Sequence, residues 1–452
     1  MPRYSPYEEY INSGVEWLDV IPAHWNLSKV KYLAPFQVGW TPPTKNDENF
    51  NGSNIWVNIS DLKAKVITSS EKKISDKAAK EASMSITPQG SLMYSFKLSV
   101  GAVSFAGCDM YTNEAIASFL ENDHLPLSYL YYALPKFVIE NASTNIYGAK
   151  ILNQELIKNA LLLAPPYDEA ELIANFLNHE TAKIDTLIEK QQQLITLLKE
   201  KRQAVISHAV TKGLNPDAPM KDSGVEWLGQ VPENWTFSQL GYCAFVTKLT
   251  GFEYTNVWQT EEDGEVIALR GFNIKERKLD LKNVEKISSK LSKKLGRSKL
   301  SKGDIVFPCT GTIGNAALIE IDDQFHINQN IAKIRFDSSV HPRFAIYWLT
   351  SSYVRTTIDR NNSSGMQPVV LIGDIRKLPF PKMGFQEQEH IANFLDLSIT
   401  RMDYLISKAL DGIELMEERR TALISAAVTG KIDVRNWKPT DNKNTEEGEV
   451  TI

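Results

Sequence analysis

The chain has 452 residues, of which 42% are hydrophobic and 23% charged, and its formal net charge is −5. This length is too great for a single hydrophobic core and predicts two or more domains. The sequence shows no apolar run of the roughly 18 residues that a membrane span needs, no apolar secretory segment near its N-terminus and only three isolated cysteines, so we expect a cytoplasmic protein without disulfides or a zinc site.

The first motif is Ser-Gly-Val-Glu-Trp-Leu at residues 13–18, followed by Pro22 and Trp25, and it returns at residues 223–228, followed by Pro232 and Trp235. After each copy, short β-branched and aromatic runs such as residues 55–59 and 304–307 predict strands, and segments near 126–133 and 341–350 predict helices. Each copy therefore opens a globule that we expect to be mixed α+β, with a strand order that cannot be read.

A long helix is predicted from Ile173 to Thr211, and it recurs from Ile391 to Thr429 at a constant offset of 218 residues. A heptad fits both copies. One line of its seam is Leu177, Ile184, Gln191, Leu198 and Val205 in the first helix, and Leu395, Met402, Ala409, Met416 and Leu423 in the second. The other line includes Ile173, Leu187 and Leu194, then Ile391, Leu405 and Gly412. Such a stripe more often packs a helix on its own domain, but the length and the duplication favour a rod of two paired helices.

Proline and glycine mark the limits of these parts. Pro165-Pro166 and residues 379–381 are expected at the start of each long helix, because Pro is tolerated before a helix but not inside it. We expect a first globule at 1–167, a helix at 168–212 and a linker at 213–222. A second globule follows at 223–385, a second helix at 386–430 and an acidic, partly disordered tail at 431–452.

The acidic net charge mildly disfavours a nucleic-acid partner, but the charge is unevenly distributed. Between Arg270 and Lys302 there are twelve Lys or Arg residues and three acidic ones. A run of this kind is often only a solvated face. Because it lies just before the Gly-containing turn at residues 309–314, phosphate binding is the favoured interpretation.

In this order, the motifs resemble the DNA specificity subunit of a type I restriction–modification system. The resemblance rests on the repeated SGVEWL…P..W opening, the turns at 99–102 and 312–315, and the repeated IANFL…D…I…R helix, and it covers nearly the whole chain. It implies an α+β fold with two target-recognition domains alternating with two long helices. These helices would pair as an antiparallel intramolecular coiled coil with pseudo-two-fold symmetry.

The resemblance also implies a function. Each globule would read one half of a bipartite site on double-stranded DNA, and the coiled coil would set the spacer and dock two methyltransferase subunits. Restriction or motor subunits could join them. The chain itself would hold no cofactor, because S-adenosylmethionine belongs to the methyltransferase partner, and ATP and Mg to the restriction partner.

The candidate DNA-binding residues are polar side chains on predicted loops, since Arg and Lys suit guanine and Asn and Gln suit adenine. In the first globule they are Ser95, Lys97, Ser99, Tyr147 and Lys150. In the second they are Arg270, Asn273, Thr310, Thr312 and Gln367, together with Lys275, Lys293 and Lys294 of the basic run. For each of them a turn or cap role is the alternative.

One segment of the sequence resembles a catalytic motif. Ala164-Pro165-Pro166-Tyr167 superficially resembles the [ND]PP[YF] motif of amino-methyltransferases, but it lacks the leading Asn or Asp. The sequence contains no GxxxxGK[ST] phosphate loop and no HExxH pattern. We therefore predict a non-catalytic chain. A self-contained DNA methyltransferase or nuclease, and a coiled-coil scaffold without base readout, stay open as alternatives.

Overall fold

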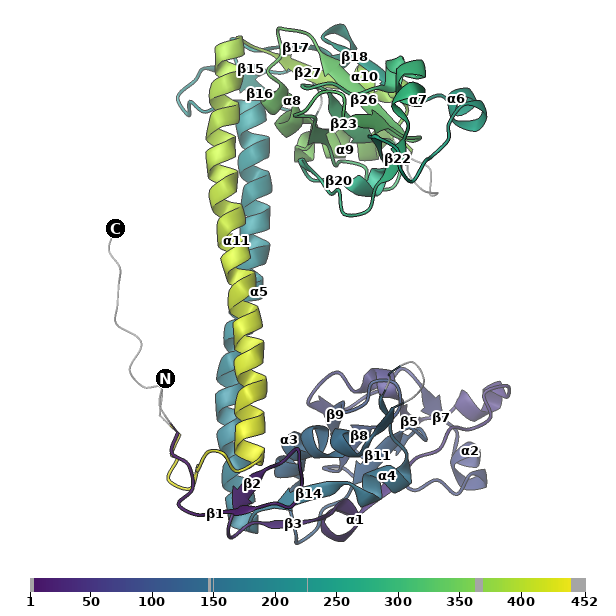
Figure 1. Ribbon diagram of the computed structural model, residues 1–452, viewed down its shortest axis with the longest axis vertical. Helices are drawn as coiled ribbons and strands as arrows, with labels where there is room; N and C mark the ends of the chain where they lie inside the picture. The colour runs from purple at the N-terminus through teal and green to yellow at the C-terminus, as the bar shows by residue number, and fades with distance from the viewer. Residues whose placement is uncertain (1–3, 145–147, 149, 226, 362–368, 440–452) are drawn as a thin grey trace. The chain divides into compact units, whose positions relative to one another are not determined.

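The computed structural model describes residues 4–144, 148, 150–225, 227–361 and 369–439 (Figure 1). The chain divides into two compact units. Unit 1 comprises residues 1–190 and 412–452, and unit 2 comprises residues 191–411. Each unit therefore contains one globule and one half of each long helix, and unit 1 is discontinuous in sequence whereas unit 2 is continuous.

The core of unit 1 is a five-stranded sheet with the order β4-β11-β8-β9-β6. Its strands are β4 (Phe36–Val38), β11 (Ile116–Phe119), β8 (Leu92–Ser95), β9 (Val103–Ala106) and β6 (Val66–Ile67). A second sheet has β5 (Asn54–Val57) between β10 (Tyr111–Thr112) and β7 (Lys73–Ile74). All four residues of β8 are buried, as expected for a central strand covered on both faces, and α3 (Leu127–Phe137) packs into the same core.

Unit 2 repeats this arrangement. Its four-stranded sheet has the order β18-β26-β23-β24, with β18 (Ala244–Lys248), β26 (Ile331–Phe336), β23 (Ile305–Pro308) and β24 (Ala317–Leu318). A three-stranded sheet has β19 (Val266–Leu269) between β22 (Glu285–Ile287) and β25 (Phe325–Ile327). In both units the middle strand of the smaller sheet pairs parallel on one side and antiparallel on the other. The mixed α+β class is thus observed in both globules, and their larger sheets share the order of four strands, to which unit 1 adds β6 at the edge.

The remaining elements are short. In unit 1 they are α1 (Val30–Leu33), α2 (Asp76–Glu81), α4 (Gln154–Asn159), and the pair β12 (Ser143–Thr144) and β13 (Lys150–Ile151). In unit 2 they are α6 (Gly251–Asn256), α7 (Ser289–Lys294), α8 (Pro342–Leu349), α9 (Ser352–Asn361), α10 (Ile372–Lys377), and the hairpin of β20 (Ile274–Lys275) and β21 (Lys278–Leu279).

The first SGVEWL motif forms the turn of a β-hairpin, made by β1 (Tyr10–Asn12) and β2 (Val20–Pro22) in unit 1. The corresponding strands of unit 2 are β15 (Met220–Asp222) and β16 (Gln230–Pro232). Gly14 and Gly224 both have positive φ, at 72° and 70°, and their N–H groups donate to the side chains of Asn12 and Asp222. The motif therefore specifies a turn that needs glycine.

The tryptophans that follow each hairpin tie it to a long helix. The Trp25 indole donates to Glu169 Oε1 at 3.1 Å, and the Trp235 indole donates to Glu387 Oε1 at 2.8 Å. Both glutamates lie in the first turn of their helix. Each Trp thus fixes the place where a long helix leaves its globule.

Residues 379–381 precede the second long helix, as expected, but they form a strand of their own. β27 (Pro379–Lys382) is a strand, antiparallel to β17 (Thr236–Gln239), just as β14 (Leu161–Ala164) pairs with β3 (Asn26–Lys29) in unit 1. Pro379 and Pro381 are two residues apart, so both missing N–H groups are on the edge that faces away from β17. The second long helix begins only at Phe385.

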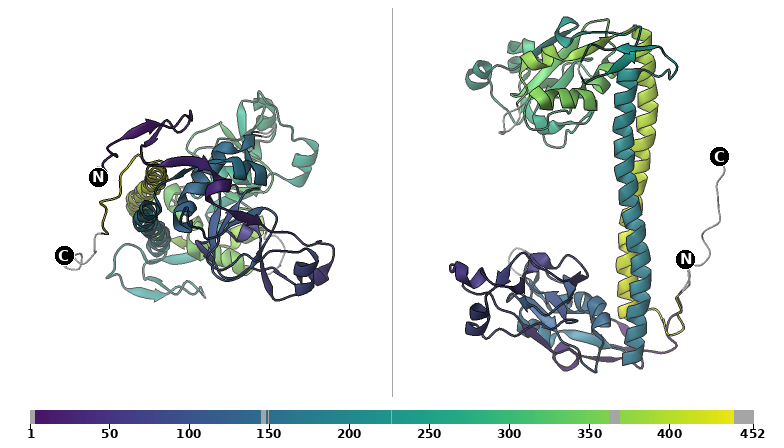
Figure 2. Two further views of the ribbon diagram at one scale, coloured as in Figure 1. Left: turned by 90° about the horizontal axis from the view of Figure 1, so that it is seen from below. Right: turned by 180° about the vertical axis from the view of Figure 1, so that it is seen from behind.

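The long helices are α5 (Tyr167–Lys212) and α11 (Phe385–Val428), and within each unit their segments lie side by side in every view (Figure 2). In unit 2, Glu387 lies near Gly213 while Arg202 binds Asp403, so the two segments run in opposite directions. In unit 1 the Tyr129 hydroxyl lies 3.2 Å from the Leu163 carbonyl, just before α5, and 3.4 Å from the Val428 carbonyl at the end of α11, while Asp185 binds Arg420. The order of these contacts again gives opposite directions.

One line of the predicted seam faces inward. Leu177 and Ile184 of α5, and Leu395 and Ala409 of α11, are buried. The other line is buried at its first residues, Ile173 and Ile391. Farther along the helices its assignment was wrong, because Leu187, Leu194 and Leu405 are 51%, 43% and 43% exposed, and a Cβ at Gly412 would meet no atom within 4 Å. The residues next to these positions, Ile195 and Ile406, are buried instead.

Candidate nucleic-acid interface

The candidate interface of unit 2 starts where β19 ends. Arg270 opens a short turn, and its N–H donates to Asn273 Oδ1 at 2.9 Å. The Asn273 amide in turn donates to the carbonyls of Asp280 and Asn283, both at 2.8 Å, and the residue is only 1% exposed. The side chain of Asn273 is fully used in shaping this loop, so the prediction that it contacts a base does not fit the structure.

Three loops of unit 2 meet around a cavity of about 190 Å³. Its lining includes Arg270, Thr310 and Gln329, each from a different loop, with Tyr254 and Phe272 as aromatic walls. The Arg270 guanidinium lies 5.5 Å from the centroid of the Phe272 ring and also pairs with Glu285. Aromatic rings beside a cation and amide groups are the mixture that base recognition uses.

Thr312 belongs to the same site. Its hydroxyl donates to the Gly271 carbonyl at 3.1 Å, which links the loop after β23 to the loop after β19. The structure thus brings together three of the predicted residues of this globule, Arg270, Thr310 and Thr312. Gln367 lies outside the described residues.

The predicted lysines of unit 2 lie elsewhere. Lys293 and Lys294 are exposed on α7. Lys275 is on β20 and lines a groove of about 1040 Å³ between this hairpin and the long helices of unit 2, together with Arg202, Arg277 and Lys278. Because Glu276 and Asp403 line the same groove and pair with Arg202, part of its positive charge is compensated locally.

In unit 1, Lys97 and Ser99 are exposed on the loop between β8 and β9, and Lys150 is exposed on β13. Ser95 is completely buried at the end of β8, and its hydroxyl donates to the Lys97 carbonyl at 3.2 Å. It therefore supports the loop rather than presenting a polar group to a ligand, which corrects the prediction for Ser95. Tyr147 lies outside the described residues.

Sequence reasoning missed Asn58, the counterpart of Arg270. The Asn58 N–H donates to Asp61 Oδ2 at 2.9 Å, in the way that the Arg270 N–H donates to Asn273. Each residue directly follows the middle strand of the smaller sheet. A polar residue directly after the strand, followed three positions later by Asp or Asn, was the available signal in both globules.

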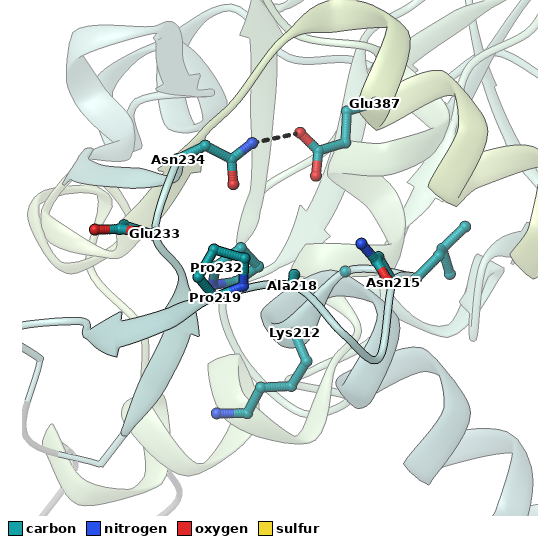
Figure 3. A pocket seen from close by; sticks show the side chains of 10 residues that line it. Lys212, Asn215, Ala218, Pro219, Pro232, Glu233, Asn234 and Glu387 are labelled. Carbon is teal, nitrogen blue, oxygen red and sulfur yellow. Dashed lines mark hydrogen bonds between the residues drawn. The ribbon is translucent and has the colours of Figure 1, made fainter.

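A further cavity of about 500 Å³ lies where α5 ends in unit 2 (Figure 3). Pro219, Pro232 and Ala218 form part of its wall, and the Glu387 carboxylate, which accepts from Asn234 at 3.3 Å, lies at one side. A carboxylate repels phosphate, so we do not assign this cavity to the nucleic-acid interface.

Within the described ranges, no cluster of three or more His, Cys, Asp or Glu side chains has the arrangement of a metal site. In the same part of the chain, no helix combines the length and the apolar character of a membrane span.

The chain matches known proteins over most of its length. The family model of the type I restriction modification DNA specificity domain matches twice, at residues 22–197 and 232–414. The specificity subunit of the type I restriction enzyme EcoBI from Escherichia coli is 23% identical over 325 residues, which cover 71% of this chain and 68% of that protein. The specificity subunit of MjaIX from Methanocaldococcus jannaschii is 27% identical over 186 residues, covering 40% of this chain and 42% of its own length.

Solved structures have the same fold. A chain from a study of complex assembly and conformational transition of the type I R-M system aligns with a TM-score of 0.69 at 13% identity, over 91% of this chain and 99% of that one. The HsdS subunit from Thermoanaerobacter tengcongensis aligns with a TM-score of 0.52 at 12% identity, over 91% and 98%. Since the family model matches both globules and more than half of the chain, the protein belongs to the type I restriction–modification DNA specificity family.

Proposed function

We propose that this chain is the DNA-recognition subunit of a type I restriction–modification complex, and that each unit reads one half of a bipartite site. The observation that carries the proposal is a shared framework with different side chains at its loops. Where unit 1 has Asn58, unit 2 has Arg270 after the same strand. A common scaffold with exchanged polar groups suits two readers of different base sequences, because bases differ in their donor and acceptor patterns.

Within unit 2, Arg270 is the candidate for guanine, because its guanidinium offers parallel donors to O6 and N7. Thr310 and Thr312 would add contacts from the neighbouring loop, and Gln329 of the same cavity is a candidate for adenine. Lys275, Lys293 and Lys294 would contact phosphates. In unit 1, Lys97, Ser99 and Lys150 take the corresponding roles, while Ser95 and Asn273 hold the loops in place.

The two long helices would act as an antiparallel coiled coil that relates the units by a pseudo-two-fold axis and sets the spacer between the half-sites. The ion pairs of Arg202 with Asp403 and of Arg420 with Asp185, which repeat at the offset of 218 residues, support this pairing. The backbone of duplex DNA has two-fold axes perpendicular to its helix axis, so two similar readers at a fixed separation suit two half-sites.

The outer face of these helices would dock two methyltransferase subunits. Leu187 and Leu197 are 51% and 61% exposed, and their repeats, Leu405 and Leu415, are 43% and 66% exposed. Exposed apolar side chains that recur in both halves are suited to two copies of one partner. The partners would supply catalysis, with S-adenosylmethionine in the methyltransferase and ATP and Mg in a restriction subunit.

The decisive experiment is to exchange residues 26–165 for the matching segment of a related subunit and to map the methylated adenines made by the chain with its methyltransferase partner. The expected result is a site in which one half changes and the other half and the gap persist. A change of both halves together would contradict independent readers.

Two further assays address the alternatives. Methylation by the isolated chain with S-adenosylmethionine would identify an enzyme, and the absence of salt-dependent DNA binding would identify a scaffold.

A further inference from the structure

Leu98 lies on the loop between β8 and β9 with 94% of its surface exposed. Its φ is +57°, in the left-handed region that L residues with bulky side chains avoid. Among the described residues, it is the only apolar one besides glycine that has positive φ. A Leu that is both strained and solvated adds nothing to the core, so folding does not explain its presence at this position.

The second unit shows what the backbone requires here. The turns at 99–102 and 312–315 correspond, so Leu98 corresponds to Gly311, whose φ is +74°. The loops are anchored alike, since the Phe96 N–H donates to Ala115 at 3.0 Å and the Cys309 N–H donates to Asn330 at 2.7 Å. The shared loop therefore needs a residue with a left-handed backbone conformation at this position. Glycine adopts this conformation without strain in unit 2, whereas unit 1 has the side chain of Leu98 at the same position of the loop.

The loop holds this group in a defined place. The Gly101 N–H donates to the Ser95 carbonyl at 2.9 Å, the Ser95 N–H donates to Ala102 at 2.8 Å, and the Ser95 hydroxyl donates to the Lys97 carbonyl. The neighbours of Leu98 on both sides, Lys97 and Ser99, are exposed and polar. A rigid apolar tip between a cation and a hydroxyl fits a ligand that has anionic, polar and apolar groups side by side.

We propose that Leu98 is a specificity-determining residue that packs against the 5-methyl group of a thymine in the half-site read by unit 1. The inference rests on the proposed function, in which this loop faces DNA. Leucine has neither donor nor acceptor, so it can select a base edge only by apolar contact. The thymine methyl is the apolar group that the major groove offers. Unit 2, with Gly311 at this place, makes no such contact.

The test uses the full chain and a duplex that carries its mapped target, in a binding titration at one fixed salt concentration. Each thymine of the half-site read by unit 1 is replaced singly by deoxyuridine, which lacks the methyl group. Wild-type affinity should fall about fourfold at one of these positions, the effect of losing one buried methyl group. Leu98→Gly should abolish this sensitivity at that position alone, and Leu98→Met, which keeps an apolar side chain, should retain it.

Leu98→Gly is a suitable variant because glycine already occupies the corresponding position of unit 2, so its melting temperature should equal or exceed that of the wild type. If wild type and Leu98→Gly respond identically to every deoxyuridine while both still bind the target specifically, the role of Leu98 is overturned and the proposed function stands. The same duplex can carry the fluorescent base 2-aminopurine next to the half-site thymines. If its fluorescence changed on binding of the wild type but not of Leu98→Gly, the Leu98 side chain would be inserted between base pairs, and the thymine contact would be overturned. If the wild-type chain shows no preference for its target, the proposed function itself fails.

Discussion

Arg202 of α5 donates to Asp403 of α11 at 2.6 Å, and the same pair recurs in the other unit, where Arg420 donates to Asp185 at 2.8 Å. Each unit thus has one copy of the ion pair. The arginine is on α5 in unit 2 and on α11 in unit 1, and the aspartate is on the other helix in each case. The copies differ in their surroundings, because Arg202 also binds Glu276 next to the β20–β21 hairpin, at 2.6 Å. In unit 2 this arginine fastens the globule to the helix pair as well as one helix to the other.

This difference predicts unequal costs for matched substitutions. Arg420→Met should lower stability by less than about 1 kcal/mol, as is usual for a solvent-exposed pair. Arg202→Met should cost about 1–2 kcal/mol, because it leaves Asp403 without its cation and Glu276 with Arg277 alone, and the Arg202 side chain is only 17% exposed. Calorimetric melting of both variants would measure this. Equal melting temperatures would mean that the Glu276 contact contributes nothing.

The position of the seam predicts opposite outcomes for adjacent residues. Ile195→Asp should destabilise the protein by several kcal/mol, because Ile195 is 7% exposed and the new carboxylate would be buried without a partner. Leu194→Asp, one residue away and 43% exposed, should leave the melting temperature almost unchanged. The measurement is thermal unfolding by circular dichroism. If Leu194→Asp lowered the melting temperature more than Ile195→Asp, the helix contact would run through Leu194, as the sequence predicted.

The family, the duplication and the mixed α+β class were predictable from the sequence, because repeated motifs and a long helical period survive when the loops diverge. The second line of the seam was not. Leu187-Ile188, Leu194-Ile195 and Leu405-Ile406 are adjacent apolar pairs, so two heptad frames fit equally well and only the packing decides between them. The buried line belongs to the isoleucines at 195 and 406.

At the candidate site, residue type identified the loops but not the orientation of each side chain. Asn273 and Ser95 are polar residues beside strands, as base-contacting residues would be, yet both turn inward and bond to backbone carbonyls. The sequence pattern cannot separate these roles, since Asn and Ser commonly bond to nearby backbone groups in turns. Leu98 was missed for the converse reason, because an apolar residue is assigned to the core unless its backbone conformation is known.

Burial of His326 predicts a dependence of stability on pH. The residue is fully buried, its ring nitrogens lie 2.8 Å from the Ile327 carbonyl and 3.2 Å from the Leu295 carbonyl, and burial lowers its pKa below the usual 6.5. The unfolded chain therefore binds a proton more readily, so this contribution to stability is present above about pH 6.5 and is lost as the pH falls through the folded pKa. The difference in melting temperature between wild type and His326→Gln should shrink from pH 8 to pH 5. A difference independent of pH would refute this role.

The last prediction concerns the helices as the element that sets the spacer. A 21-residue insertion of three heptads into both helices, after Lys190 and after Asp411, keeps the apolar line continuous and adds about 31 Å of helix. At about 3.4 Å per base pair this corresponds to roughly nine base pairs, close to one turn of DNA, so each reader should again face its groove. The expected product is a target with both half-sites unchanged and the gap longer by about one turn, detected by sequencing of methylated DNA. The control carries the insertion in α5 alone, which leaves 21 residues without a partner helix and should reduce modification of every site. New bases in either half-site at a constant gap would mean that the helices do not set the spacing.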